Sequence, residues 1–162
     1  MRVLGVDFGL RRIGLALSDE GERLASPFRA LSIASVREAP GAVASAAREV
    51  EAGAIVVGAP LGLEGEEERP EVRRARRFAQ ALRRATGLPV HLVDESLSSR
   101  QAAEGASAGG RDVTGRAASG RDATNDALHA AAAAVILQRW LDEAPRRAAA
   151  RRARAAGREK RP

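Results

Sequence analysis

The side chains in this sequence that are best suited to chemistry are acids at the ends of apolar segments. Asp7 ends one such segment, and Asp94 and Glu95 end another. Asp126 stands near the start of a helical segment, three residues before His129. A carboxylate at the end of a buried segment costs several kcal/mol unless it is solvated, paired or bound to a cation. For Asp7 alone, an aspartate that caps a turn is an equally good interpretation.

Taken together, the acids point to a metal site. In open α/β sheets, ligands bind outside the carboxyl ends of the strands. If the first and last strands are parallel and close, Asp7 and Glu95 meet at that edge, and the last helix can bring Asp126 to it. Three carboxylates in one cleft repel one another unless a cation is present. Mg²⁺ and Mn²⁺ suit oxygen ligands, and two such ions about 4 Å apart can activate water against a phosphodiester.

Two details of this site stay open at the level of sequence. Asp94 and Glu95 alternate in direction along their strand, so one of them faces the cleft and the sequence does not say which. His129 projects from the same side of its helix as Asp126. It either completes the metal site, or moves a proton, or merely lies where the helix meets the sheet.

The elements that position these residues alternate between strands and helices. We predict strands over residues 2–8, 12–18, 24–33, 55–58 and 90–95, with Pro27 on an edge strand. We predict helices over 35–51, from Pro70 to Thr86 with Gly87 as cap, from Ser98 or Ser99 to 106, and over 125–143, capped by Thr124 or Asn125. The glycine-rich stretch 105–123 is predicted to be a surface loop, and Asp19 a surface or capping residue. This order indicates an α/β sheet with helices on both faces.

Size and composition indicate one soluble, cytoplasmic domain. The chain has 162 residues and no cysteine, which excludes a disulfide framework. No apolar run approaches the length of a membrane span, and no signal region precedes the first strand. With three Phe, one Trp and no Tyr, recognition of single strands by stacked aromatic rings is disfavoured.

Positive charge gathers in two places. Residues 144–162 carry eight Arg or Lys and one Glu, whereas the whole chain has a net charge of +6. This basic tail is interpreted either as a disordered solubilising segment or as a segment that binds polyanions without sequence preference. The helix 70–86 carries six further arginines. They either hold phosphates or belong to a solvated helix that pairs with nearby glutamates.

Five motifs, in order and at plausible spacing, resemble the YqgF/RuvX family, which has a ribonuclease H-like fold. They are Gly5-Val6-Asp7-Phe8-Gly9 with 12–19, Val57-Gly58-Ala59-Pro60-Leu61 with Gly65, Arg76-Arg77-Phe78-Ala79, Asp94-Glu95-Ser96-Leu97 with Ala102 and Glu104, and Ala133-Ala134-Val135-Ile136-Leu137-Gln138. The resemblance covers about residues 1–142. It implies a nuclease domain over 1–143 with a mixed five-stranded sheet and helices on both faces, followed by the tail 144–162.

The resemblance also implies a metal-dependent nuclease in which Asp7 and Glu95 are the first two catalytic acids. The family's last aspartate falls on His129 in this sequence, and Asp126 lies one turn earlier. Since related resolvases can use an Asp and a His one turn apart on this helix, we expect Asp126 to be the third ligand, with His129 as a second member of the site. Ser96 stands where the family usually has Arg.

Members of this family are thought to process the 5′ end of the 16S ribosomal RNA precursor, so RNA is the expected partner of a monomer or homodimer. A resolvase that cuts branched DNA is the alternative among enzymes, and it needs a symmetric dimer. A non-catalytic RNA-binding protein is an alternative of another class. An actin-like ATPase or sugar kinase opens with a similar strand-turn-strand, but it needs a second lobe for which this chain is too short.

Overall fold

A computed structural model describes residues 1–59, 69–94 and 120–145 of the chain. In these residues the elements are, in chain order, β1 Arg2–Phe8, β2 Arg12–Ser18, β3 Ala25–Ser32, α1 Ala39–Glu49, β4 Ala52–Ala59, α2 Pro70–Thr86, β5 Val90–Asp94 and α4 Gly120–Asp142. None of the helices in this described part is both long and apolar enough to cross a membrane.

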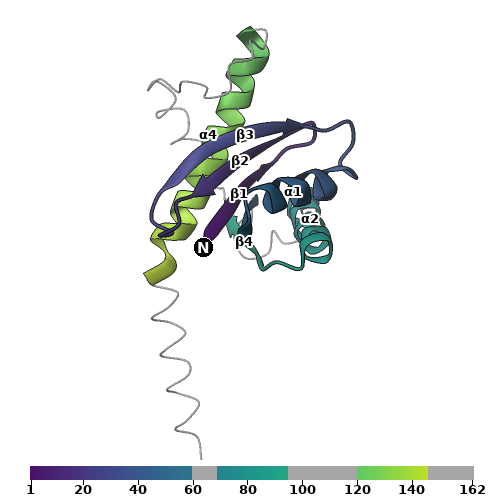
Figure 1. Cartoon of the computed structure of the whole chain (residues 1–162). Helices are drawn as coiled ribbons and strands as arrows, with labels where there is room; N and C mark the ends of the chain where they lie inside the picture. Colours follow the sequence, from purple (N-terminus) through teal and green to yellow (C-terminus); the bar gives the residue numbers. More distant parts are fainter. Residues whose placement is uncertain (60–68, 95–119, 146–162) are drawn as a thin grey trace, which may run out of the picture.

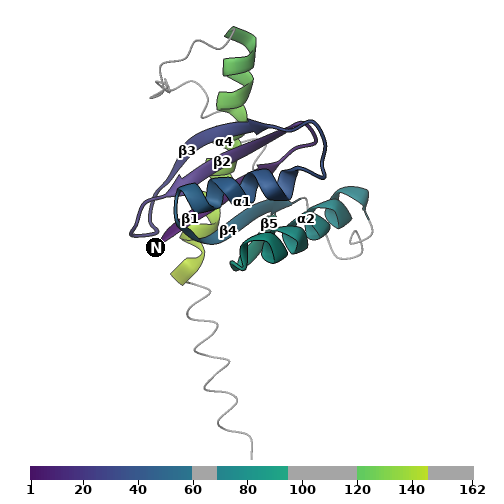
Figure 2. The same ribbon diagram turned by 45° about the vertical axis from the view of Figure 1, so that its right-hand side comes forward.

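The strands form one mixed sheet with the order β3-β2-β1-β4-β5. The first three strands are antiparallel neighbours, whereas β1, β4 and β5 run parallel. α1 and α2 cover one face of the sheet, and α4 crosses the other face (Figures 1 and 2). This arrangement confirms the predicted α/β fold with a mixed five-stranded sheet and helices on both faces.

Alternation along β1 divides its side chains between two cores. Leu4 and Val6 are buried in the core beneath α1 and α2, and Phe8 packs against that core. Val3 is buried in the second core, beneath α4. Because Asp7 alternates with Val6 and Phe8, its side chain lies on the α4 face of the sheet, close to the carboxyl end of β1.

Several predicted elements are confirmed by the structure. The strands over 2–8 and 12–18 have the predicted bounds, and Pro27 lies in β3, an edge strand of the sheet. α2 spans Pro70–Thr86 as predicted, and Gly87 ends it in the left-handed region at φ 69°. Asp19 is confirmed as a capping residue, because its carboxylate accepts hydrogen bonds from the backbone N–H groups of Arg23 and Leu24.

Other predictions were wrong at the ends of helices. α1 begins at Ala39 rather than at 35, with Pro40 in its first turn, so Val36 precedes the helix and is exposed. α4 begins at Gly120, so residues 120–123 are helical rather than loop and Thr124 and Asn125 cannot cap it. Apolar periodicity missed this first turn because its residues have no apolar face to bury.

Two further findings concern the side chains of α4 and the length of β4. Leu128 of α4 is 46% exposed, whereas Ile136 and Leu137 are buried against the sheet. β4 extends over Ala52–Ala59, beyond the predicted 55–58. The predicted helix 98–106, most of the predicted loop 105–123 and most of the basic tail lie outside the described residues.

Candidate active site

Asp7 and His129 meet at the carboxyl end of β1. Nδ1 of His129 lies 3.3 Å from Oδ2 of Asp7, and both side chains are partly buried. Asp7 arrives from the sheet and His129 from α4, so the contact joins residues 122 positions apart in sequence. The structure therefore brings together two of the four predicted site residues.

Glycines in the sheet allow α4 to approach this closely. Gly14 pairs with Asp7 across β1 and β2, and a Cβ at position 14 would lie 1.9 Å from the carbonyl oxygen of His129. At Gly5 a Cβ would lie 2.7 Å from Cβ of Leu137. The helix backbone thus rests directly on glycine positions, and this contact fixes the height of His129 above Asp7.

Burial makes the Asp7 carboxyl a weaker acid than an exposed aspartate. Loss of hydration raises the pKa of Asp7 above its ordinary value, and the hydrogen bond and charge of His129 oppose this only in part. A desolvated carboxylate is stabilised by any cation that binds to it. Binding of a cation would therefore stabilise the ionised form of the Asp7 carboxyl.

Asp126 has a different partner. Its Oδ1 accepts a hydrogen bond from Nη1 of Arg12, the first residue of β2. Arg12 also closes the turn after β1, since its carbonyl oxygen accepts a hydrogen bond from the N–H of Gly9 at 3.0 Å. The Arg12–Asp126 pair was missed by sequence reasoning. The signal available was an arginine five residues after Asp7, at the start of the neighbouring strand.

The second predicted acid lies at the limit of the described residues. Glu95 itself is outside them, whereas Asp94 is the last residue of β5 and pairs with Ala59 of β4. Val93 is buried in the core beneath α4, and Leu92 packs against the opposite core. By alternation, Asp94 belongs to the sheet face away from Asp7.

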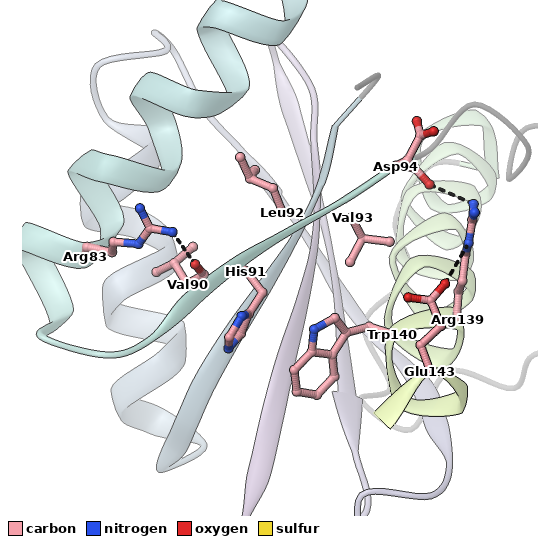
Figure 3. Close-up of a pocket in the computed structure, with 9 residues that line it drawn as sticks. All are labelled: Arg83, Val90, His91, Leu92, Val93, Asp94, Arg139, Trp140 and Glu143. Atoms are coloured by element: carbon pink, nitrogen blue, oxygen red, sulfur yellow. Dashed lines mark hydrogen bonds and ion pairs between the residues drawn. The ribbon is translucent and has the colours of Figure 1, made fainter. Parts of the chain in front are cut away.

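A cavity of about 390 Å³ follows the free edge of β5 (Figure 3). Arg83 of α2 and Arg139 of α4 donate hydrogen bonds to the carbonyl oxygens of Val90 and Asp94, at the two ends of the strand. The ring centroid of His91 lies 5.2 Å from that of Trp140. Arginines that cover outward carbonyl groups protect a sheet edge from pairing with other strands.

Comparison with known proteins decides the family. The RuvX family, described as a Holliday junction resolvase, matches residues 1–143. This chain belongs to the RuvX family. A relative from Anaeromyxobacter sp. (strain Fw109-5), named as a pre-16S rRNA nuclease, is 44% identical over 147 residues, covering 88% of this chain and 97% of the relative. One from Maridesulfovibrio salexigens with the same name is 36% identical and matched over its full length, covering 89% of this chain.

The structure of Thermus thermophilus RuvC in complex with a Holliday junction substrate resembles this fold. The TM-score is 0.54 at 15% sequence identity, and the match covers 87% of this chain and 93% of that one. At this identity the likeness concerns the fold alone. It agrees with the ribonuclease H-like architecture of the RuvX family, and the names of the relatives support a nuclease function.

The described residues supply only part of a divalent-cation site, but a carboxylate and an imidazole are suitable ligands for such an ion. Asp7 offers a desolvated carboxylate, and His129 offers an imidazole nitrogen 3.3 Å away. In the part of the chain that the structure describes, no three His, Asp or Glu side chains form a cluster that could hold a metal ion. Glu95, the predicted second acid, lies outside the described residues.

Proposed function

We propose that this protein is a metal-dependent nuclease that hydrolyses phosphodiester bonds in the 5′-end processing of pre-16S ribosomal RNA. The observation that carries the proposal is the partly buried carboxylate of Asp7 beside His129, at the carboxyl edge of a ribonuclease H-like sheet. The names of relatives that match most of this chain support the RNA substrate. A role in ribosome maturation would place the protein in the cytoplasm.

Asp7, Glu95 and His129 are the residues that we propose to hold Mg²⁺ or Mn²⁺. Bound there as a pair, such ions would supply an activated water and stabilise the leaving oxygen of the phosphodiester. Asp126 remains a predicted ligand, but its hydrogen bond to Arg12 favours His129 as the third member of the site. Strand alternation supports Glu95 rather than Asp94 as the acid that joins Asp7.

The protein's own residues have distinct tasks in this proposal. Asp7 supplies negative charge at a partly buried position, where reduced hydration strengthens its attraction to any cation. His129 orients the Asp7 carboxylate through the 3.3 Å contact, and its imidazole can move a proton at neutral pH. To meet Asp7 and His129, the scissile phosphodiester of the RNA must reach the carboxyl edge of the sheet between β1 and α4.

Cleavage of a labelled RNA that contains the 5′ end of pre-16S rRNA tests this proposal. We expect cutting that requires Mg²⁺ or Mn²⁺, is abolished in Asp7→Asn and falls strongly in His129→Ala. Asp142→Asn is the matched control, because it neutralises an exposed acid near the other end of α4. Cutting that persists in Asp7→Asn would refute the assignment of the site.

Branched DNA is the second candidate substrate, favoured by the description of the RuvX family as a Holliday junction resolvase. Cutting of paired strands needs two active sites related by symmetry, and hence a homodimer. The same assay with a four-way DNA junction, combined with the molar mass in solution, distinguishes the two. Tight RNA binding with no metal-dependent cutting of either substrate would instead support the non-catalytic RNA-binding alternative.

A further inference from the structure

Arginine is the most frequent residue on the exposed surface of α2. The helix carries six arginines and one acid, Glu71, whereas α1 carries one arginine and one glutamate. Arg73, Arg76, Arg77, Arg83 and Arg84 are all exposed, and we call these five residues the α2 ridge. At 3.6 residues per turn they fall within about 120° of the helix circumference.

The opposite side of α2 explains why the ridge faces outward. Val72, Ala75, Phe78, Ala79 and Leu82 are buried against the sheet and α1. The helix therefore has a complete apolar face of its own, and the sequence needs no arginine on the outer face for folding. Figure 2 shows α2 beside α1 on the face of the sheet that α4 does not cover.

The α2 ridge lacks the features of a protein-binding surface. Interfaces between proteins depend on a few buried aromatic or aliphatic anchors. Among the described residues, the large hydrophobic side chains that are exposed lie elsewhere, and none is on α2. Contacts with a phosphate backbone require only cations at suitable spacing. The charge and the absence of anchors on this helix therefore favour a nucleic-acid backbone over a protein.

α2 is fastened to the residue next to Asp7. The rings of Phe8 and Phe78 are stacked, with centroids 4.0 Å apart and planes 4° from parallel. Phe78 follows Arg77, so the first half of the ridge lies near the carboxyl end of β1. Because Asp7 faces α4 and Phe8 faces α2, the ridge and the proposed catalytic site lie on opposite faces of the sheet.

We propose that the α2 ridge binds the phosphate backbone of the RNA substrate on the face of the sheet opposite to Asp7. Arg77 and Arg84 have none of the hydrogen bonds or ion pairs that form among the described residues, and they lie two helical turns apart on the exposed side. They can contact two separate phosphates. The inference rests on the proposed function, since it takes RNA as the substrate, but it concerns binding rather than cleavage.

The test measures RNA binding without cutting. The affinity of a labelled RNA duplex is titrated against salt in EDTA for the full chain and for Arg77→Gln/Arg84→Gln. Arg2→Gln/Arg23→Gln is the matched control, since it removes the same charge from exposed positions at the far end of β1 and in the β2–β3 turn. Arg77→Lys/Arg84→Lys retains the charge. All four residues are exposed, so we expect unfolding temperatures close to that of the parent.

We expect the α2 double variant to bind RNA on the order of tenfold or more weakly at 0.1 M salt, with a salt slope reduced by about 1.5, because each phosphate contact contributes about 0.7–0.9. The lysine variant should keep most of the affinity. Equal losses in the α2 and control variants would overturn the proposal, as would displacement of the RNA by polyglutamate as effectively as by RNA of the same charge.

A second measurement separates this proposal from the proposed function. Bis(p-nitrophenyl) phosphate has one phosphodiester and is too small to reach the ridge from Asp7. We expect its metal-dependent hydrolysis to be unchanged in Arg77→Gln/Arg84→Gln and lost in Asp7→Asn. If no variant or parent hydrolyses it while RNA binding still depends on the ridge, the catalytic proposal fails and the ridge proposal stands.

Discussion

Gly14 lies directly beneath the backbone of His129, with a hypothetical Cβ at position 14 only 1.9 Å from the His129 carbonyl oxygen. Gly14 is also the residue that pairs with Asp7 across β1 and β2. The two members of the candidate site are thus held by the same glycine, one through the sheet and the other through the packing of α4. Any side chain at position 14 must push the helix away from Asp7.

Gly14→Ala should therefore reduce both stability and cleavage. Overlap with backbone atoms cannot be relieved by a rotamer change, so we expect a loss of about 3 kcal/mol, at the upper end for overpacking. The control is Gly41→Ala in α1, where a Cβ meets nothing within 4 Å and the exchange should stabilise by up to about 1 kcal/mol. Urea denaturation of both variants measures the difference, and equal stabilities would contradict the packing argument.

Asp7→Asn should stabilise the protein in the absence of divalent ions while abolishing cleavage. Burial raises the pKa of Asp7 in the folded state, so the ionised carboxylate lowers the free energy of unfolding at neutral pH. This cost is fully present above the folded pKa and is relieved as the pH falls through it. In EDTA at pH 7, we expect the unfolding temperature of Asp7→Asn to exceed that of the parent. The difference between the two temperatures should shrink towards acidic pH.

A gap between parent and Asp7→Asn that widens towards acidic pH would show that the pKa of Asp7 is lowered, not raised. The matched control is Asp142→Asn, which removes an exposed carboxyl from the same chain. Stability gained by removing a charged residue is the expected sign of a group kept for function.

Much of this fold could be predicted from sequence because burial and chain direction leave clear patterns. β1 and β2 are short apolar runs separated by a glycine-bearing turn. α2 begins at Pro70 and is capped by Gly87, and each of these residues limits the helix through its own backbone geometry. The start of α4 at Gly120 leaves no such pattern. It lies in a stretch rich in glycine whose first turn has no apolar periodicity.

The candidate site was predictable by residue type but not by pairing. Asp7 and His129 could each be singled out, since an acid ends an apolar strand and a histidine follows an acid by one turn. Which acid has which partner depends on the rotation of α4 above the sheet. That rotation places His129 at Asp7 and leaves Asp126 with Arg12, and it is set by glycine contacts that periodicity does not encode.

Divalent ions should stabilise the parent through Asp7. A ligand that binds only the folded state adds about 2.7 kcal/mol to the free energy of unfolding at 100 times its Kd. We expect Mn²⁺ to raise the unfolding temperature of the parent, EDTA to reverse this, and Asp7→Asn to lack the response. Asp19→Asn is the control, since Asp19 lies in the β2–β3 turn.

The same metal titration distinguishes the two candidates for the third ligand. His129 contacts Asp7, whereas Asp126 is bonded to Arg12. We therefore expect His129→Ala to weaken the Mn²⁺ response and Asp126→Asn to retain it. A response lost in Asp126→Asn and kept in His129→Ala would show that Asp126 leaves Arg12 to bind the ion, as the sequence alone suggested.

Asp19 should make the stability of the β2–β3 turn depend on pH. Hydrogen bonds from the backbone N–H groups of Leu24 and Arg23 lower the pKa of Asp19 below its ordinary value of 3.8. The ionised carboxylate therefore stabilises the folded chain above pH 3.8, and this contribution is lost as the pH falls through the lower, folded pKa. Asp19→Ala should unfold at lower temperature than the parent at pH 7, and the two should converge in strong acid. Glu20→Gln, which changes an adjacent side chain that is 82% exposed, should follow the parent throughout, and an equal loss in both variants would show that charge alone, rather than the capped turn, is responsible.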